Sequence, residues 1–124
     1  MYLVMLALHD SEKLQDLLTA WEEAGVSGAT VLPSTGLGRI RRQQALREDL
    51  PLMPTLDNLF ARVENLSHTI LSVVDNDRMV DSLISAAERV VGDLRKPDTG
   101  ILVVIPVLRA YGVEKEAQVQ EVVR

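Results

Sequence analysis

The chain has 124 residues and a formal net charge of −5 at pH 7, which predicts one domain and argues against nucleic acid or an anionic membrane as the main partner. It contains no cysteine, so disulfides, thiol nucleophiles and thiolate metal sites are excluded. Its apolar runs at residues 2–8 and 101–108 are too short to cross a bilayer, and the first has no basic leader. We therefore expect a cytoplasmic protein without direct membrane insertion.

The first third of the chain predicts a strand, a helix and a second strand. Residues 2–8 are nearly all apolar and predict the first strand, after which Asp10 is placed to cap a helix that ends at Gly25. Residues 29–32 predict the second strand, which runs into Pro33. The apolar face of the helix is formed by Leu14, Leu17, Leu18, Trp21 and Ala24.

The second half of the chain repeats this pattern. The phrase His-Asp-Ser-Glu-Lys-Leu-Gln-Asp at residues 9–16 returns as Val-Asp-Asn-Asp-Arg-Met-Val-Asp at residues 74–81. Residues 69–74 predict a third strand, and Asp75 or Asn76 caps a helix that precedes a fourth strand at residues 101–108. The apolar face of this second helix is formed by Val80, Leu83, Ile84, Ala87, Val91 and Leu94.

A repeated strand–helix–strand unit predicts an α+β fold, the ferredoxin-like split βαβ sandwich, in which two helices cover one face of a four-stranded antiparallel sheet. Pro33 ends the second strand and Pro106 lies in the fourth, and proline lacks the amide hydrogen that a central strand donates. The expected strand order is therefore fourth, first, third, second. We expect one domain over residues 1–112, with a connector at 39–66 and a polar tail at 113–124.

The first and fourth strands lack the alternation of a sheet with one wet face. Two helices cover only one face, so the other face would expose several hundred Å² of apolar surface, more than monomers usually show. We expect this face to be buried against other copies of the chain.

The residue sets of the common catalytic mechanisms are missing. The two histidines, His9 and His68, fall at strand ends without carboxylates at ligand spacing, and Ser34 lies in no nucleophile-elbow pattern. The helical carboxylates fall on outer faces, where solvated acids are common. We therefore do not expect an enzyme or a metal site.

A glycine and arginine cluster follows the second strand. Gly36 and Gly38 allow close approach to the backbone, and the arginines after them form a basic focus on an acidic protein. This pattern indicates an anionic ligand or partner, with a solvated charged loop as the alternative. The cluster comprises Gly36, Leu37, Gly38, Arg39, Arg41, Arg42 and Arg47.

At these residues the chain resembles the PII signal-transduction family over about residues 1–112. The similarity is carried by Ala-Gly-Val-Ser-Gly-Ala-Thr-Val at 24–31, by Gly-Leu-Gly-Arg at 36–39 and by Pro106-Val107. It implies a homotrimer in which a T-loop and a B-loop line an adenine-nucleotide site (ATP, ADP or AMP) in each cleft between subunits. By position, it implicates Gly36, Leu37, Gly38, Arg39, Asp98, Thr99 and Gly100, with Arg109 as the nearest candidate for a C-loop arginine.

The chain departs from the family pattern at three points. Ile101 stands where the family has the B-loop lysine, Ile40 stands where it has a glutamine, and no tyrosine lies between Arg39 and Asn65. Uridylylation of the loop therefore cannot apply, and no cofactor is certain. Fold and trimer are implied more strongly than ATP and 2-oxoglutarate sensing.

The connector also predicts a short helix. Thr55 is placed to cap it, and its apolar residues share one face. We favour its packing on the trimer over its docking on a target such as a transporter or metabolic enzyme. The candidate partner-binding residues of the loop are Arg41, Arg42, Arg47, Leu56, Leu59 and Phe60.

Together these patterns predict a PII-like trimeric regulator that binds a small anionic ligand between subunits. The first alternative is a ligand-independent, CutA-like or interaction-module trimer. The second is an acylphosphatase-like enzyme, which would need an arginine and an asparagine that Arg39 and Asn76 do not obviously supply.

Overall fold

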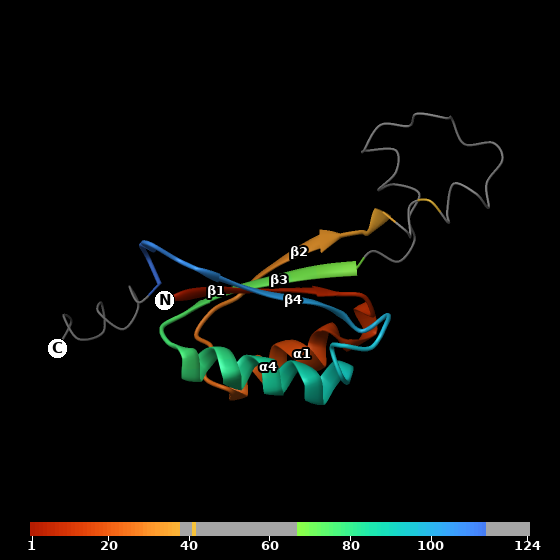
Figure 1. Cartoon of the computed structure of the whole chain (residues 1–124), viewed down its shortest axis with the longest axis horizontal. Helices are drawn as coiled ribbons and strands as arrows, with labels where there is room; N and C mark the ends of the chain where they lie inside the picture. The colour runs from red at the N-terminus through yellow and green to blue at the C-terminus, as the bar shows by residue number, and fades with distance from the viewer. Residues whose placement is uncertain (38–40, 42–66, 114–124) are drawn as a thin grey trace.

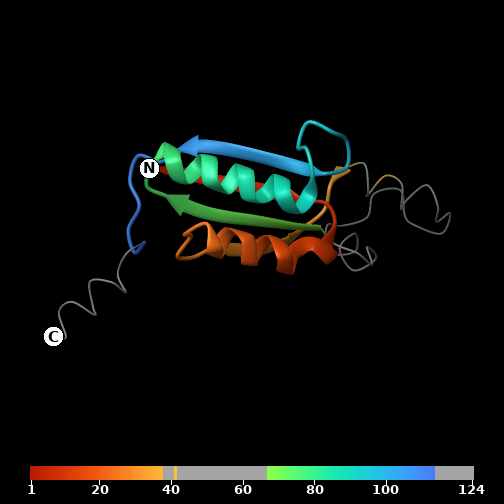
Figure 2. The ribbon, with the colours of Figure 1, turned by 90° about the horizontal axis from the view of Figure 1, so that it is seen from below.

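The computed structural model describes residues 1–37, 41 and 67–113, in which two helices cover one face of a four-stranded sheet (Figure 1). The elements are β1 (Tyr2–Leu8), α1 (Leu14–Glu23), β2 (Thr30–Ser34), β3 (Ser67–Val74), α4 (Asp77–Val91) and β4 (Gly100–Pro106), with a 3-10 turn at Ser11–Lys13 before α1. Figure 2 shows α1 and α4 side by side on the same side of the sheet. The predicted ferredoxin-like fold is confirmed.

The strand order is β2-β3-β1-β4, and every neighbouring pair is antiparallel. In the centre of the sheet Leu6 pairs with Ile70 on one side and with Leu102 on the other. The expected order is therefore confirmed, with the proline-containing strands at the two edges.

Side chains cap α4 and the 3-10 turn before α1, whereas Lys13, the N-cap residue of α1 itself, makes no side-chain cap hydrogen bond. The Asp10 carboxylate accepts a hydrogen bond from the Glu12 amide at 3.0 Å, so the chain makes a 3-10 turn before α1 begins. The Asn76 side chain accepts from the Met79 amide at 2.9 Å and starts α4 directly. Gly92 follows α4 at φ +92°, a conformation that favours glycine.

The core lies between the helices and the sheet. Trp21 of α1 is buried, and its indole N–H donates to the Leu83 carbonyl of α4 at 3.2 Å, which ties the two helices together. The fully buried large side chains are Trp21, Leu6, Leu8, Leu17, Ile70, Leu83 and Val4. Both predicted apolar helix faces point into this core.

Neither described helix covers the opposite face of the sheet (Figure 1), and the strand registers place apolar side chains on it. Because Val4, Leu6 and Leu8 of β1 are buried under the helices, the alternate residues of each strand face the other way. Ile101, for example, is 60% exposed. We call this surface the outer apolar face; it comprises Leu3, Met5, Ala7, Leu32, Leu71, Val73, Ile101, Val103 and Ile105.

The strand limits differ from the expected ones at three strands. β2 ends at Ser34 and includes Pro33, which an edge strand tolerates because one side of it donates no ladder hydrogen bonds. β3 begins two residues early, at Ser67, and β4 ends at Pro106. The short helix predicted in the 39–66 connector and the tail beyond residue 113 lie outside the described residues.

Candidate functional site

The two turns predicted to bind a ligand lie at the same end of the sheet. The register pairs Leu8 with both His68 and Gly100, and pairs Ser34 with Ser67. One end of the sheet is therefore formed by the last residues of β1 and β2 and the first residues of β3 and β4. The chain leaves this end toward Gly36 (Figure 1). We call it the loop end of the sheet.

Two buried polar atoms at the loop end have no hydrogen-bond partner among the residues that the structure describes. They are Oγ1 of Thr35, directly after β2, and Nδ1 of His68 in β3. The register pairs His68 with Pro33, two residues before Thr35, so both side chains belong to the same corner of the sheet. An unpaired buried polar atom costs about 1–3 kcal/mol, so hydrogen bonding within the described residues is incomplete at this corner.

Side-chain hydrogen bonds fix the chain close to these atoms. The Thr69 hydroxyl donates to Oγ of Ser34 at 2.9 Å, which joins β3 to the last residue of β2. The Ser67 hydroxyl lies 3.5 Å from the carbonyl oxygen of His9, beyond the end of β1. The backbone that leads into the glycine turn therefore starts from a fixed position.

Gly36 begins the turn in open space. A Cβ added there would meet no atom within 4 Å, and its φ lies outside the left-handed region. Neither packing against the described residues nor backbone conformation therefore requires glycine here. Leu37 is 66% exposed, so this side of the turn is accessible.

The second turn, before β4, has a different reason for its glycine. A Cβ on Gly100, whose φ is +144°, would lie 2.7 Å from the Ala7 carbonyl oxygen, so the pairing of β4 with β1 requires glycine. The Thr99 hydroxyl donates to the Lys96 carbonyl at 3.0 Å, and Asp98 adopts φ +65°. The turn is thus held by its own hydrogen bond, with Asp98 exposed.

Arg95 and Asp93, in the segment between α4 and this turn, form a bidentate ion pair. Arg95 donates from Nε and from an Nη atom to the two carboxylate oxygens of Asp93, each at 3.1 Å. These hydrogen bonds lower the pKa of Asp93 and raise that of Arg95. The Arg95 guanidinium is therefore engaged within its own turn, whereas Lys96 is exposed.

A single chain does not bring all the predicted site residues together. β2 and β4 are opposite edges of the sheet, so Gly36 and Gly100 leave it three strand spacings apart, about 14 Å. Arg109 follows the far end of β4, about 20 Å along that strand from Gly100. Arg41 is exposed. The predicted residues Gly38, Arg39, Arg42, Arg47, Leu56, Leu59 and Phe60 lie outside the described residues.

Sequence reasoning did not assign Thr35 and His68 to the site. It interpreted His68 as a polar residue at a strand end, and it did not single out Thr35. The available signal was that both polar residues adjoin strands that pack against a core.

In residues 1–37, 41 and 67–113, no group of three or more His, Cys, Asp or Glu side chains is placed to hold a metal ion. None of the described helices is long and apolar enough to cross a membrane.

Comparison with known proteins gives a family. The model of the nitrogen regulatory protein P-II family matches residues 3–117. No curated protein matches the chain closely enough to be counted. P-II proteins are non-enzymatic regulators, which confirms the prediction that the chain is not an enzyme. The match covers most of the chain and, except for Tyr2, the four strands and two helices that the structure describes, so this protein belongs to the P-II family.

Proposed function

We propose that this protein is a trimeric regulator that binds a small anionic ligand, an adenine nucleotide, at the loop end of the sheet and reports its presence to a partner protein. The observation that carries this proposal is the pair of unpaired buried atoms, Thr35 Oγ1 and His68 Nδ1, beside the open glycine turn. Family membership supplies the regulatory role. The partner is a transporter or a metabolic enzyme, and the protein acts in the cytoplasm, as P-II proteins generally do.

The proposed site lies between subunits. The glycine turn and the Asp98–Gly100 turn leave opposite edge strands, and Arg109 leaves the far end of β4. A neighbouring chain seated against the outer apolar face would bring further polar groups to the same cleft. P-II proteins are typically trimeric, which supports this arrangement.

The charge available to the ligand sets the expected affinity. Arg39 supplies a guanidinium at the glycine turn, but Ile101 offers no cation at the other turn. A charge-assisted hydrogen bond contributes about 1.5–3 kcal/mol, so its loss lowers affinity by roughly one to two decades. We therefore expect binding between the micromolar and millimolar ranges.

A thermal-shift screen of ATP, ADP, AMP, cyclic nucleotides and 2-oxoglutarate tests the proposal. A ligand at a hundred times its dissociation constant stabilises the folded state by about 2.7 kcal/mol, an easily measured shift. Arg39→Ala removes the guanidinium, and Gly36→Asp places a carboxylate in open space at the turn. Both variants should lose the nucleotide-dependent shift.

Gly28→Asp is the matched control, because a Cβ at Gly28 also meets nothing within 4 Å and the residue precedes the opposite end of β2. It should respond to nucleotide like the parent. If no nucleotide changes the melting temperature at millimolar concentration, or if Arg39→Ala and Gly36→Asp respond like the parent, the ligand proposal is wrong. The second candidate, an interaction trimer that needs no ligand, then takes its place. Ile101, which offers no phosphate-binding cation, favours that candidate.

A further inference from the structure

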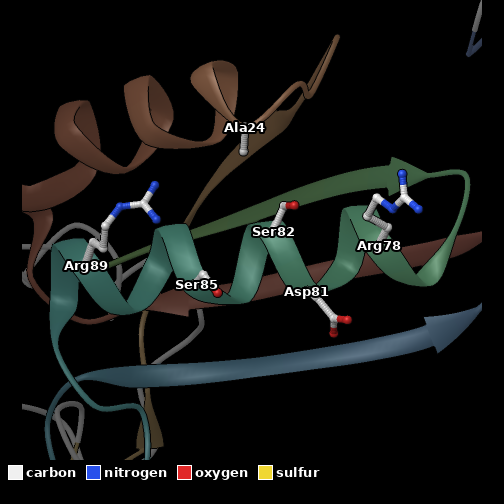
Figure 3. A pocket seen from close by; sticks show the side chains of 6 residues that line it. All are labelled: Ala24, Arg78, Asp81, Ser82, Ser85 and Arg89. Atoms are coloured by element: carbon white, nitrogen blue, oxygen red, sulfur yellow. The ribbon is translucent and has the colours of Figure 1, made fainter.

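The exposed side of α4 carries side chains for which the proposed ligand site has no use. Arg78, Ser82, Ser85 and Arg89 are spaced i, i+4, i+7 and i+11, so they share one face of the helix. Together with Asp81 and with Ala24 at the end of α1, they line a groove of about 380 Å³, which we call the α4 groove. In Figure 3, Arg78, Ser82 and Arg89 all extend toward the side where α1 and Ala24 lie.

The two arginines of the α4 groove are uncompensated. Both are exposed, and within the described chain neither forms an ion pair or a side-chain hydrogen bond, even with Glu22 and Glu23 at the end of α1. Asp81 lines the groove, but its carboxylate points away from both guanidinium groups, toward β4 (Figure 3).

The other acids of α4 are engaged elsewhere. Asp77 lies against the Tyr2 hydroxyl, and its hydrogen bond and negative charge raise the pKa of that phenol. Glu88 accepts a hydrogen bond from the Leu94 amide at 3.3 Å. The groove therefore presents two guanidinium groups beside the single carboxylate of Asp81, on a chain whose net charge is −5.

The distance between Arg78 and Arg89 matches the distance between residues three turns apart on a second helix. Eleven residues of α-helix rise about 16 Å, or three turns, so Arg78 and Arg89 are separated by about that distance along α4. Between them lie Ser82 and Ser85, with Ala24 opposite, and small side chains allow another helix to approach closely. A guanidinium binds a carboxylate through two parallel hydrogen bonds.

We propose that the α4 groove docks an acidic helical segment of a partner protein, whose two carboxylates lie three turns apart and bind Arg78 and Arg89. Two cations are too few for the run of phosphates on a nucleic acid, and the acidic balance of the chain opposes such binding. Because α4 lies on the side of the sheet away from the outer apolar face (Figure 1), association through that face leaves the α4 groove open.

Fluorescence anisotropy with designed peptides on the full chain tests the proposal. The probe is a labelled, alanine-rich helical peptide of about 20 residues with two glutamates eleven positions apart. One control peptide carries glutamines at those positions, and a second carries the glutamates nine positions apart, on opposite faces of the helix. The first peptide should bind at least tenfold more tightly than either control, and its affinity should fall as salt rises.

Variants of the chain locate the binding. Arg78→Ala and Arg89→Ala should each weaken binding of the first peptide about tenfold, as expected for a lost charge-assisted hydrogen bond. The double variant Arg95→Ala, Lys96→Ala removes two positive charges just beyond α4 and should bind like the parent. The charge reversal Arg78→Glu, Arg89→Glu should instead prefer a peptide with lysines at the two positions. All four residues are exposed, so melting temperatures should change little.

Several results would overturn the docking proposal. They are absence of binding at millimolar peptide, equal binding of the two glutamate peptides, parent-like binding by the Arg78→Ala, Arg89→Ala double variant, and displacement of the peptide by a short DNA duplex at equal concentration. None of these results depends on nucleotide, so this test and the ligand test above fail independently.

Discussion

At the scale of single residues, Gly100 and Gly28 differ in what an added methyl group would meet. At Gly100 it would lie 2.7 Å from the Ala7 carbonyl on a backbone at φ +144°, whereas at Gly28 it would meet nothing within 4 Å. Gly100→Ala should therefore lower the free energy of unfolding by about 2 kcal/mol or more, and Gly28→Ala by less than about 0.5 kcal/mol. Urea denaturation followed by Trp21 fluorescence measures both. Equal midpoints for the two variants would contradict the close approach at Gly100.

Gly100 also shows which features of the fold can be predicted from the sequence and which cannot. The turn around Asp98 and the need for a glycine near it were predictable, because turn-forming residues act locally. The reason for the glycine was not, since its neighbour Ala7 comes from a strand at the other end of the chain. The unpaired atoms of Thr35 and His68 could not be predicted for a related reason. An unpaired buried atom is recognised only when all the neighbours that could bond to it are known.

At the scale of elements, the Asn76 cap decides where α4 begins. Its side chain satisfies the Met79 amide at 2.9 Å, one of the donors that a helix leaves unpaired in its first turn. Asn76→Ala should therefore destabilise the fold by about 1 kcal/mol, as a lost cap usually does. Asn76→Asp keeps an acceptor at the cap and should stay within about 0.5 kcal/mol of the parent. Thermal unfolding by circular dichroism compares the three proteins; a parent-like Asn76→Ala would show that the cap contributes nothing.

Elements were predictable where one physical pattern dominates. The helical faces that contain Trp21 and Leu83 follow a 3.6-residue period, and both are buried as expected. Strand limits were less predictable. Propensity alone ends the second strand before Pro33, whereas its pairing with His68 in β3 carries it to Ser34. The eleven-residue spacing of Arg78 and Arg89 on one helix face can be read from the sequence. That neither guanidinium forms an ion pair with a described residue is seen only in the folded structure.

At the scale of the whole molecule, the outer apolar face predicts association. Parent protein at micromolar concentration should have about three times the chain mass of 13.7 kDa when measured by light scattering. Met5→Asp places a charge in the centre of the face and should give a monomer or an unfolded chain, because an unpaired buried charge costs several kcal/mol.

Thr19→Asp is the control for this test, since Thr19 is exposed on α1 in the helix layer. It adds the same charge and should keep the parental mass. A monomeric parent, or a Met5→Asp protein of unchanged mass, would rule out association through the outer apolar face.

The central position of β1 has a consequence for how the protein is made. Of the four described strands this one is synthesised first, yet Leu6 pairs with Ile70 and Leu102, which follow 64 and 96 residues later. At a synthesis rate of roughly 5–20 residues per second, the strand waits several seconds for its last partner. Until Ile70 is made both edges of this apolar strand are unpaired, and until Leu102 is made one edge stays unpaired, a form in which nascent chains aggregate or recruit chaperones. Completion of this fold therefore depends on the last strand to be translated, and a ribosome that stalls before Gly100 holds a chain that cannot close its sheet.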